Sequence, residues 1–143
     1  MGAVYAIANQ KGGVGKTTTA VNTAACVAAA GHQTLLVDLD QQCNATVALG
    51  LDRELVPNSY GCLTGEVSVA EAARPAGPDN LWVVPAHRDL AGASVELPRI
   101  EGSETRLREM LKSPSMRPPI NESTHEVTAK YRVNATPPRD PCG

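Results

Sequence analysis

The sequence predicts an α/β fold in which a parallel sheet is flanked by helices, and three observations support this. A glycine-rich loop at 11–18 lies between a short apolar run and an alanine-rich segment. Two later apolar runs have strand length, at 34–37 and 81–84. The first of these is nearly continuous in apolar residues, as is typical of a parallel strand buried on both faces.

The predicted elements begin with a strand, a loop and a helix. The apolar run 3–8 predicts the strand, and 17–30 carries small apolar residues at helical spacing, with Gly31 as its stop. The next strand, 34–37, leads into Asp38-Leu39-Asp40. The carboxyl ends of such strands form the edge where open α/β sheets bind ligands, so we expect these carboxylates beside the loop.

The loop Lys11-Gly12-Gly13-Val14-Gly15-Lys16-Thr17-Thr18 has the composition of a phosphate-binding site. Its glycines allow backbone N–H groups to converge on an anion, and the following helix directs its positive end at the same point. Lys16 is expected to reach the β- and γ-phosphates, Thr17 to ligate magnesium, and Thr18 to donate near the α-phosphate. The pattern G-x-x-x-x-G-K-[ST] is not fully met, because Gln10 stands at its first glycine.

This loop variant, with its additional Lys11, resembles the deviant Walker A motif of the ParA/MinD group of ATPases. Residues 35–46 resemble the ParA/Soj switch sequence, except that Gln41 stands where proline is usual and Cys43 where glycine is usual. These two departures predict a switch loop that is less rigid or differently turned. With 84–93, which is similar to the family's third-strand exit, the resemblance spans about Tyr5 to Lys112.

The resemblance implies a P-loop NTPase-like fold, the cofactors ATP and Mg²⁺, and a role for each site residue. Lys11 would cross a nucleotide-sandwich homodimer to the partner's phosphates, Asp38 would help hold hydrated magnesium, and Asp40 would orient the attacking water. The candidate catalytic residues are therefore Lys11, Lys16 and Asp40, and the candidate metal ligands are Thr17 and Asp38. The candidate cofactor-binding residues are Lys11, Gly12, Gly13, Val14, Gly15, Lys16, Thr17 and Thr18.

The resemblance further implies an ATPase that acts in chromosome or plasmid partitioning. Its partners in the intact family are a ParB-like centromere-binding protein and non-specific DNA, bound through the dimer. The formal net charge of −2 and the lack of a basic stripe exclude a free-standing DNA binder. No apolar run is long enough to span a bilayer, so we expect a cytoplasmic protein, nucleoid-associated in the intact family.

Two shorter helices are predicted farther along the chain. Ser68 and Glu71 have the spacing of a capping box, and 104–112 has helical periodicity with Ser103 positioned as its N-cap. These helices are expected to cover the sheet. The resemblance implies that residues 1–112 form the amino-terminal part of a ParA-like P-loop ATPase domain.

The character of the sequence changes after Lys112. Residues 113–143 hold six of the eleven prolines and show no sustained period, which predicts an irregular or disordered tail. The family's next apolar strand, ending in an aspartate and two prolines, is not visible. We expect a truncated chain whose tail arises from a frameshift or premature stop, and a sheet with an unpaired apolar edge.

Three interpretations remain open. The chain is a ParA/Soj-type ATPase, in whole or as a fragment; it is a nucleotide-binding module without turnover; or it is an inert fragment. A MinD-like cell-division ATPase is a weaker alternative, because it would need a C-terminal amphipathic membrane helix, which the proline-rich tail does not supply.

Overall fold

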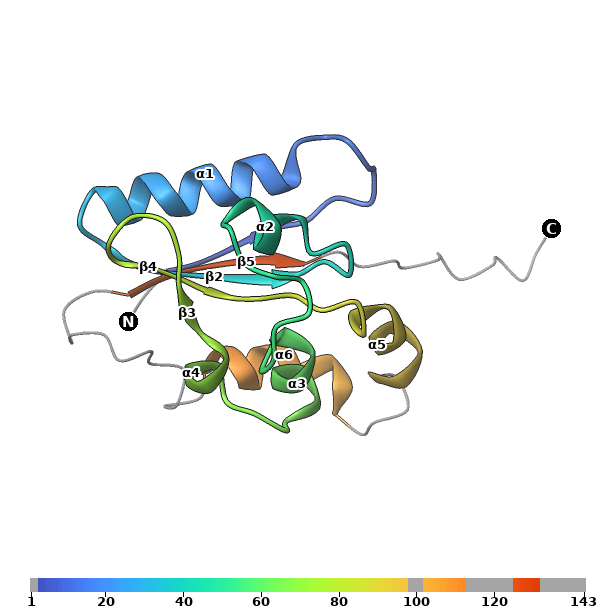
Figure 1. The fold of residues 1–143 in the computed structure, drawn as a ribbon. Helices are drawn as coiled ribbons and strands as arrows, with labels where there is room; N and C mark the ends of the chain where they lie inside the picture. Colours follow the sequence, from blue (N-terminus) through green and yellow to red (C-terminus); the bar gives the residue numbers. More distant parts are fainter. Residues whose placement is uncertain (1–2, 98–101, 113–124, 132–143) are drawn as a thin grey trace.

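The strands form one mostly parallel sheet in the computed structural model, which describes residues 3–97, 102–112 and 125–131 (Figure 1). Their order across the sheet is β1-β5-β2-β4-β3. β1, β5, β2 and β4 run parallel, and the short β3 pairs antiparallel with β4. The strands are β1 (Val4–Ile7), β2 (Gln33–Leu39), β3 (Arg74–Pro75), β4 (Leu81–Val84) and β5 (His125–Tyr131).

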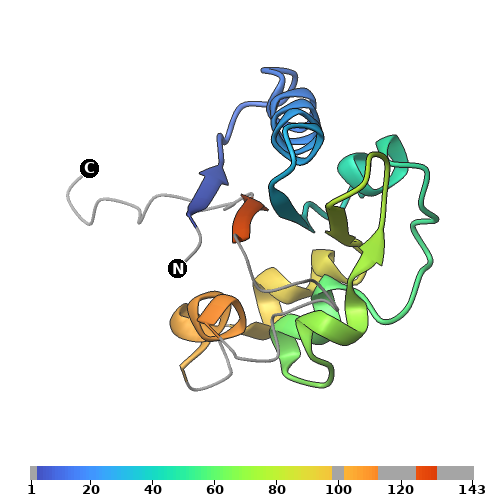
Figure 2. The same ribbon diagram turned by 90° about the vertical axis from the view of Figure 1, so that its left-hand side faces the viewer.

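Helices cover both faces of the sheet (Figures 1 and 2). One face carries α1 (Lys16–Ala29) and α2 (Asn44–Ala48). The opposite face carries α3 (Ser59–Thr64), α4 (Val69–Ala72), α5 (Leu90–Glu96) and α6 (Ser103–Lys112). The fold is therefore the three-layer α/β arrangement that the sequence predicted. No helix in the described ranges is long and apolar enough to cross a bilayer.

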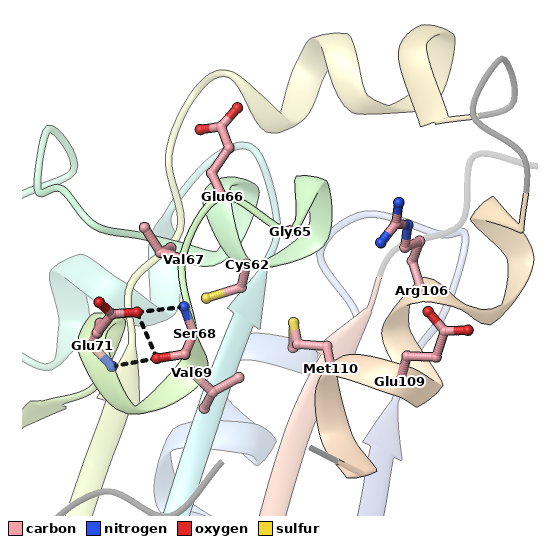
Figure 3. Close-up of a pocket in the computed structure, with 10 residues that line it drawn as sticks. All are labelled: Cys62, Gly65, Glu66, Val67, Ser68, Val69, Glu71, Arg106, Glu109 and Met110. Atoms are coloured by element: carbon pink, nitrogen blue, oxygen red, sulfur yellow. Dashed lines mark hydrogen bonds between the residues drawn. The ribbon is translucent and has the colours of Figure 1, made fainter. Parts of the chain in front are cut away.

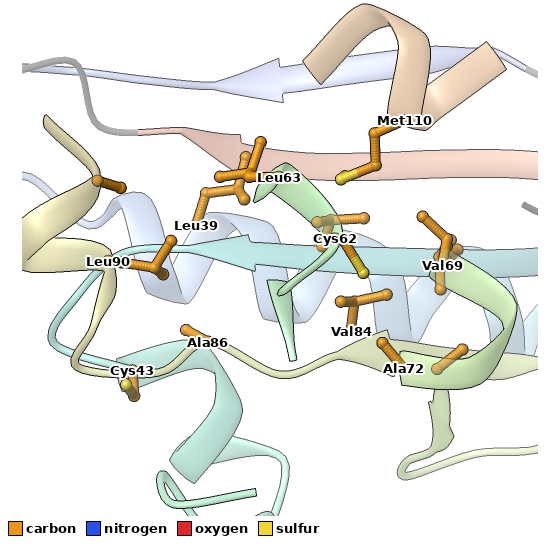
Figure 4. Packing of buried hydrophobic residues seen from close by; sticks show 14 residues of the cluster. Leu39, Cys43, Cys62, Leu63, Val69, Ala72, Val84, Ala86, Leu90 and Met110 are labelled. Carbon is orange, nitrogen blue, oxygen red and sulfur yellow. The ribbon is translucent and has the colours of Figure 1, made fainter. Parts of the chain in front are cut away.

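The core lies on the two sides of β2, whose residues from Thr34 to Leu39 are all buried. Toward α1, Leu36 packs with the small side chains of Ala20, Ala24 and Ala28, which let the helix approach the strand closely. The opposite face of β2 packs against α3–α6 (Figure 4). The members of that cluster include Leu35, Val37, Leu39, Leu63, Val84, Leu90 and Met110.

The predicted helices occur where the sequence placed them, with one shift at α6. Ser68 accepts a hydrogen bond from the Glu71 N–H at 3.2 Å and the Glu71 carboxylate accepts one from the Ser68 N–H at 2.8 Å, so the capping box is confirmed. α6 begins at Ser103 itself, so the prediction of Ser103 as the residue preceding that helix is wrong by one position.

The prediction of an irregular tail is wrong for residues 125–131. They form β5, which lies between β1 and β2 and pairs in parallel with both; Ala129 lies opposite Ala6 on one side and Val37 on the other. The backbone N–H and C=O groups of β5 pair with the two neighbouring strands. The formation of β5 therefore does not require a strongly apolar local sequence. The rest of the predicted tail lies outside the described residues.

β1 forms one edge of the described sheet. Val4 is 54% exposed and Tyr5 is 53% exposed, although both are large apolar or aromatic residues in a strand. This agrees with the expected apolar sheet edge.

Candidate functional site

The glycine-rich loop connects the end of β1 to the first turn of α1, as the motif requires. Gly13 and Gly15 have φ values of +72° and +86°, which are strained for residues with a Cβ. A Cβ at either position would meet no atom within 4 Å. The glycines are therefore needed for backbone conformation rather than for space. Gly15 also caps α1, so the unpaired N–H groups of the first helical turn face the loop.

A cavity of about 310 Å³ lies against this loop. It brings together residues of the loop, the start of α1, and the turn after β2. Its lining residues are Gly12, Gly13, Val14, Gly15, Lys16, Thr17, Thr18, Asp40, Gln42 and Asn44. Seven of the eight predicted cofactor-binding residues thus share one cavity with Asp40. The prediction of site residues did not include Gln42 and Asn44, although both lie in the segment that resembles the switch sequence.

The two lysines of the loop occupy different positions. Lys16 lines the cavity, and its Nζ donates a hydrogen bond to the Lys11 carbonyl oxygen at 2.8 Å. The Lys16 ammonium group is therefore held across the loop. Lys11 is exposed and lies outside the cavity lining, with its backbone N–H donating to Asn9 Oδ1 at 2.9 Å.

The two aspartates after β2 also differ. Asp40 lines the cavity and is 5% exposed, and its Oδ1 accepts a hydrogen bond from the Gln42 N–H at 3.1 Å. Asp38 is fully buried and lies outside the lining. Its Oδ2 accepts hydrogen bonds from the Thr46 N–H and hydroxyl at 2.9 and 2.8 Å, and its Oδ1 accepts from the Asp40 N–H at 3.2 Å.

Cys43 adopts a left-handed backbone conformation, with φ of 55° and ψ of 26°, and caps α2. Such a conformation explains why glycine is usual at this position in the switch sequence that the segment resembles. The side chain is 1% exposed. Burial, together with the nearby Asp38 carboxylate, raises the pKa of the Cys43 thiol and keeps it neutral.

The Cys43→Val variant should have a free energy of unfolding about 1–2 kcal/mol lower than that of Cys43→Gly, because a β-branched side chain is poorly tolerated at positive φ. Cys43→Gly relieves the backbone strain but removes a buried side chain, so it should stay within about 1 kcal/mol of the wild type. Urea unfolding of Cys43→Val and Cys43→Gly tests this. Equal stability of the two variants would contradict the left-handed turn.

A second cavity, also of about 310 Å³, lies between α3, α4 and α6 (Figure 3). Its described lining includes three carboxylates and one guanidinium group, those of Glu66, Glu71, Glu109 and Arg106. This excess of negative charge is unfavourable for an anionic ligand. Burial raises the pKa of the Cys62 thiol in this cavity to about 11, so that thiol is not a nucleophile at neutral pH. The glycine-rich loop is the better candidate site for a phosphate group.

Comparison with known proteins shows which family the chain belongs to. Residues 2–116 match the family described as AAA domain. The chain is 45% identical over 114 residues to the sporulation initiation inhibitor protein Soj of Bacillus subtilis, covering 79% of this chain and 45% of that protein. It is 45% identical over 113 residues to the chromosome partitioning protein ParA of Myxococcus xanthus, covering 78% and 40%.

Solved structures with a similar fold include nucleotide-bound proteins. A cobyrinic acid a,c-diamide synthase from Mycobacterium smegmatis, crystallised with an ATP analogue and magnesium, aligns with a TM-score of 0.77 and 33% identity. The alignment covers 91% of this chain and 52% of that chain.

The chain spans less than half the length of the two curated relatives, Soj and ParA. It belongs to the AAA domain family, and the matched segment is similar in sequence to Soj and ParA.

Proposed function

We propose that this chain binds Mg-ATP at the glycine-rich loop and supplies the nucleotide-binding part of a ParA/Soj-type ATPase in chromosome or plasmid partitioning. The observation that carries the proposal is the single cavity that joins the loop, Lys16, Thr17 and Asp40. Its lining includes the glycines of the loop, Lys16 and the first turn of α1, and backbone N–H groups, an ammonium group and a helix N-terminus suit a chain of phosphates.

The phosphate-binding roles belong to the loop and α1. Lys16 would leave the Lys11 carbonyl oxygen, 2.8 Å away, for the more strongly accepting β- and γ-phosphate oxygens. Thr18, which also lines the cavity, would donate near the α-phosphate. Lys11 would act on the nucleotide of a partner subunit, and its position outside its own cavity supports that assignment.

The acidic side of the site suits a magnesium ion. Thr17 would ligate it through its hydroxyl oxygen, and Asp38, which is buried outside the cavity lining, would help hold the hydrated ion. A bound magnesium ion would offset the negative charge of the phosphates. In the described part of the chain, no three side chains of His, Cys, Asp or Glu form a metal site by themselves. Asp40 reaches the cavity and would orient the attacking water.

The partners are proposed on the basis of the relatives. Homologues described as chromosome partitioning proteins support an assembly that acts on DNA. We propose a homodimer through a nucleotide sandwich, non-specific DNA binding by that dimer, and stimulation by a ParB-like centromere-binding protein. These proposals place the protein in the cytoplasm, at the nucleoid.

Thermal unfolding of the 143-residue chain with and without Mg-ATP tests the nucleotide-binding proposal. At a ligand concentration of about 100 times Kd, binding should add about 2.7 kcal/mol to the stability, which raises Tm by several degrees. AMP with magnesium is the control, because it lacks the β- and γ-phosphates that Lys16 binds. An unchanged Tm at millimolar Mg-ATP would contradict the proposal, and release of phosphate on incubation would separate an ATPase from a module without turnover.

A further inference from the structure

We propose that Thr46 is a positioning residue of the nucleotide site: it holds the Asp38 carboxylate in place and thereby sets the position of the turn that carries Asp40. The inference rests on the proposed function. Thr46 lies in α2, is fully buried, and does not line the cavity. It would therefore act through Asp38 rather than by contact with the nucleotide.

Thr46 links β2 to the segment just after β4 through its hydroxyl group. The hydroxyl donates a hydrogen bond to Asp38 Oδ2 at 2.8 Å and accepts one from the Ala86 N–H, also at 2.8 Å. The Thr46 backbone N–H donates to the same carboxylate oxygen at 2.9 Å. A hydroxyl group can donate and accept at once, which valine, of the same shape, cannot do.

The connection continues from Asp38 to the cavity. Asp38 Oδ1 accepts a hydrogen bond from the Asp40 N–H at 3.2 Å, and Asp40 Oδ1 accepts from the Gln42 N–H at 3.1 Å. Asp40 and Gln42 both line the cavity. Because Asp38 is fully buried, its carboxylate depends on such donors, and losing one should let the carboxylate and the turn shift.

Thr46→Val is the test variant, and the chain offers two matched controls. Thr46→Ser retains the hydroxyl group. Thr34→Val removes a hydroxyl from another fully buried threonine of the protein, at the opposite end of β2, where it donates to the His32 carbonyl oxygen at 2.9 Å. Thr34→Val therefore reports the general cost of losing a buried hydroxyl group.

The first readout is the Kd of ATP with magnesium and with EDTA. In EDTA, the Kd of ATP for Thr46→Val should stay within about 2-fold of the wild-type value. Magnesium tightens ATP binding, and the factor by which it lowers the Kd should be smaller by about 10-fold or more in Thr46→Val, because a charge-assisted hydrogen bond is lost. Thr46→Ser and Thr34→Val should keep that tightening. Equal weakening with and without magnesium, or the same behaviour in Thr34→Val, would overturn the inference.

The second readout needs no nucleotide. Amide hydrogen exchange at Asp40 and Gln42 should be about 10-fold faster or more in Thr46→Val than in Thr34→Val, because Asp38 loses the hydroxyl hydrogen bond that helps hold the turn. If the wild type binds no nucleotide, the proposed function fails and this comparison alone decides the inference; equal exchange rates would overturn it. Should Thr46→Val not fold, magnesium added to the wild-type ATP complex should shift the Ala86 amide resonance, and an unmoved resonance would overturn the inference.

Discussion

Replacing Lys16 with alanine should lower the affinity of the chain for ATP by a factor on the order of 100 or more. An ammonium group that binds phosphate oxygens makes charge-assisted hydrogen bonds of about 1.5–3 kcal/mol each, and about 1.4 kcal/mol corresponds to a factor of ten. Lys16 lines the cavity, and its ammonium group lies at the loop, 2.8 Å from the Lys11 carbonyl oxygen. Isothermal titration of ATP into the wild type and Lys16→Ala measures the difference.

Lys11→Ala is the matched control, because it removes the same charge from the same loop. Lys11 lies outside the cavity lining, and its carbonyl oxygen, which accepts from Lys16, is retained in the variant. We expect Lys11→Ala to bind ATP within about 3-fold of wild type, since only screened, exposed charge is lost. A similar loss in both variants would contradict the division of roles between the two lysines.

The conformation of the glycine-rich loop could be predicted from the sequence because its determinants are local. Positive φ at Gly13 and Gly15 and the start of α1 at Lys16 follow from consecutive residues. Asp40 could be added because the carboxyl end of a parallel strand meets the loop after the preceding strand. The role of Thr46 was missed, since its bond with the Ala86 N–H joins residues 40 positions apart. No local pattern encodes such a contact.

The strand β5 was also missed, because its place in the sheet depends on contacts that are distant in the sequence. Val127, Ala129 and Tyr131 alternate with Glu126, Thr128 and Lys130, which is a strand signal that could have been found. This alternation covers only six residues, whereas the six prolines of 113–143 predict an irregular tail. What stabilises β5 is its place between β1 and β2, which depends on pairing across more than 85 positions of the chain and is not visible in a local window.

Replacing Ala129 with proline should destabilise the protein by about 3 kcal/mol or more. Proline removes a backbone N–H from the ladder and leaves its acceptor unpaired, and proline is confined to edges and bulges in sheets. Ala129 lies in the middle of β5, opposite Ala6 of β1 and Val37 of β2. Typical domains have only about 5–15 kcal/mol of stability, so such a loss should be evident in urea or thermal unfolding.

Ala129→Ser is the control, because serine is small and keeps the backbone N–H; we expect it to cost about 1 kcal/mol or less. The comparison separates a paired central strand from an irregular tail. If residues 125–131 were irregular, proline would be tolerated as well as serine, because no ladder hydrogen bond would be lost. A large difference between the two variants would instead mean that the stability of the sheet that carries the glycine-rich loop, which follows β1, depends on a strand more than 100 residues later in the chain.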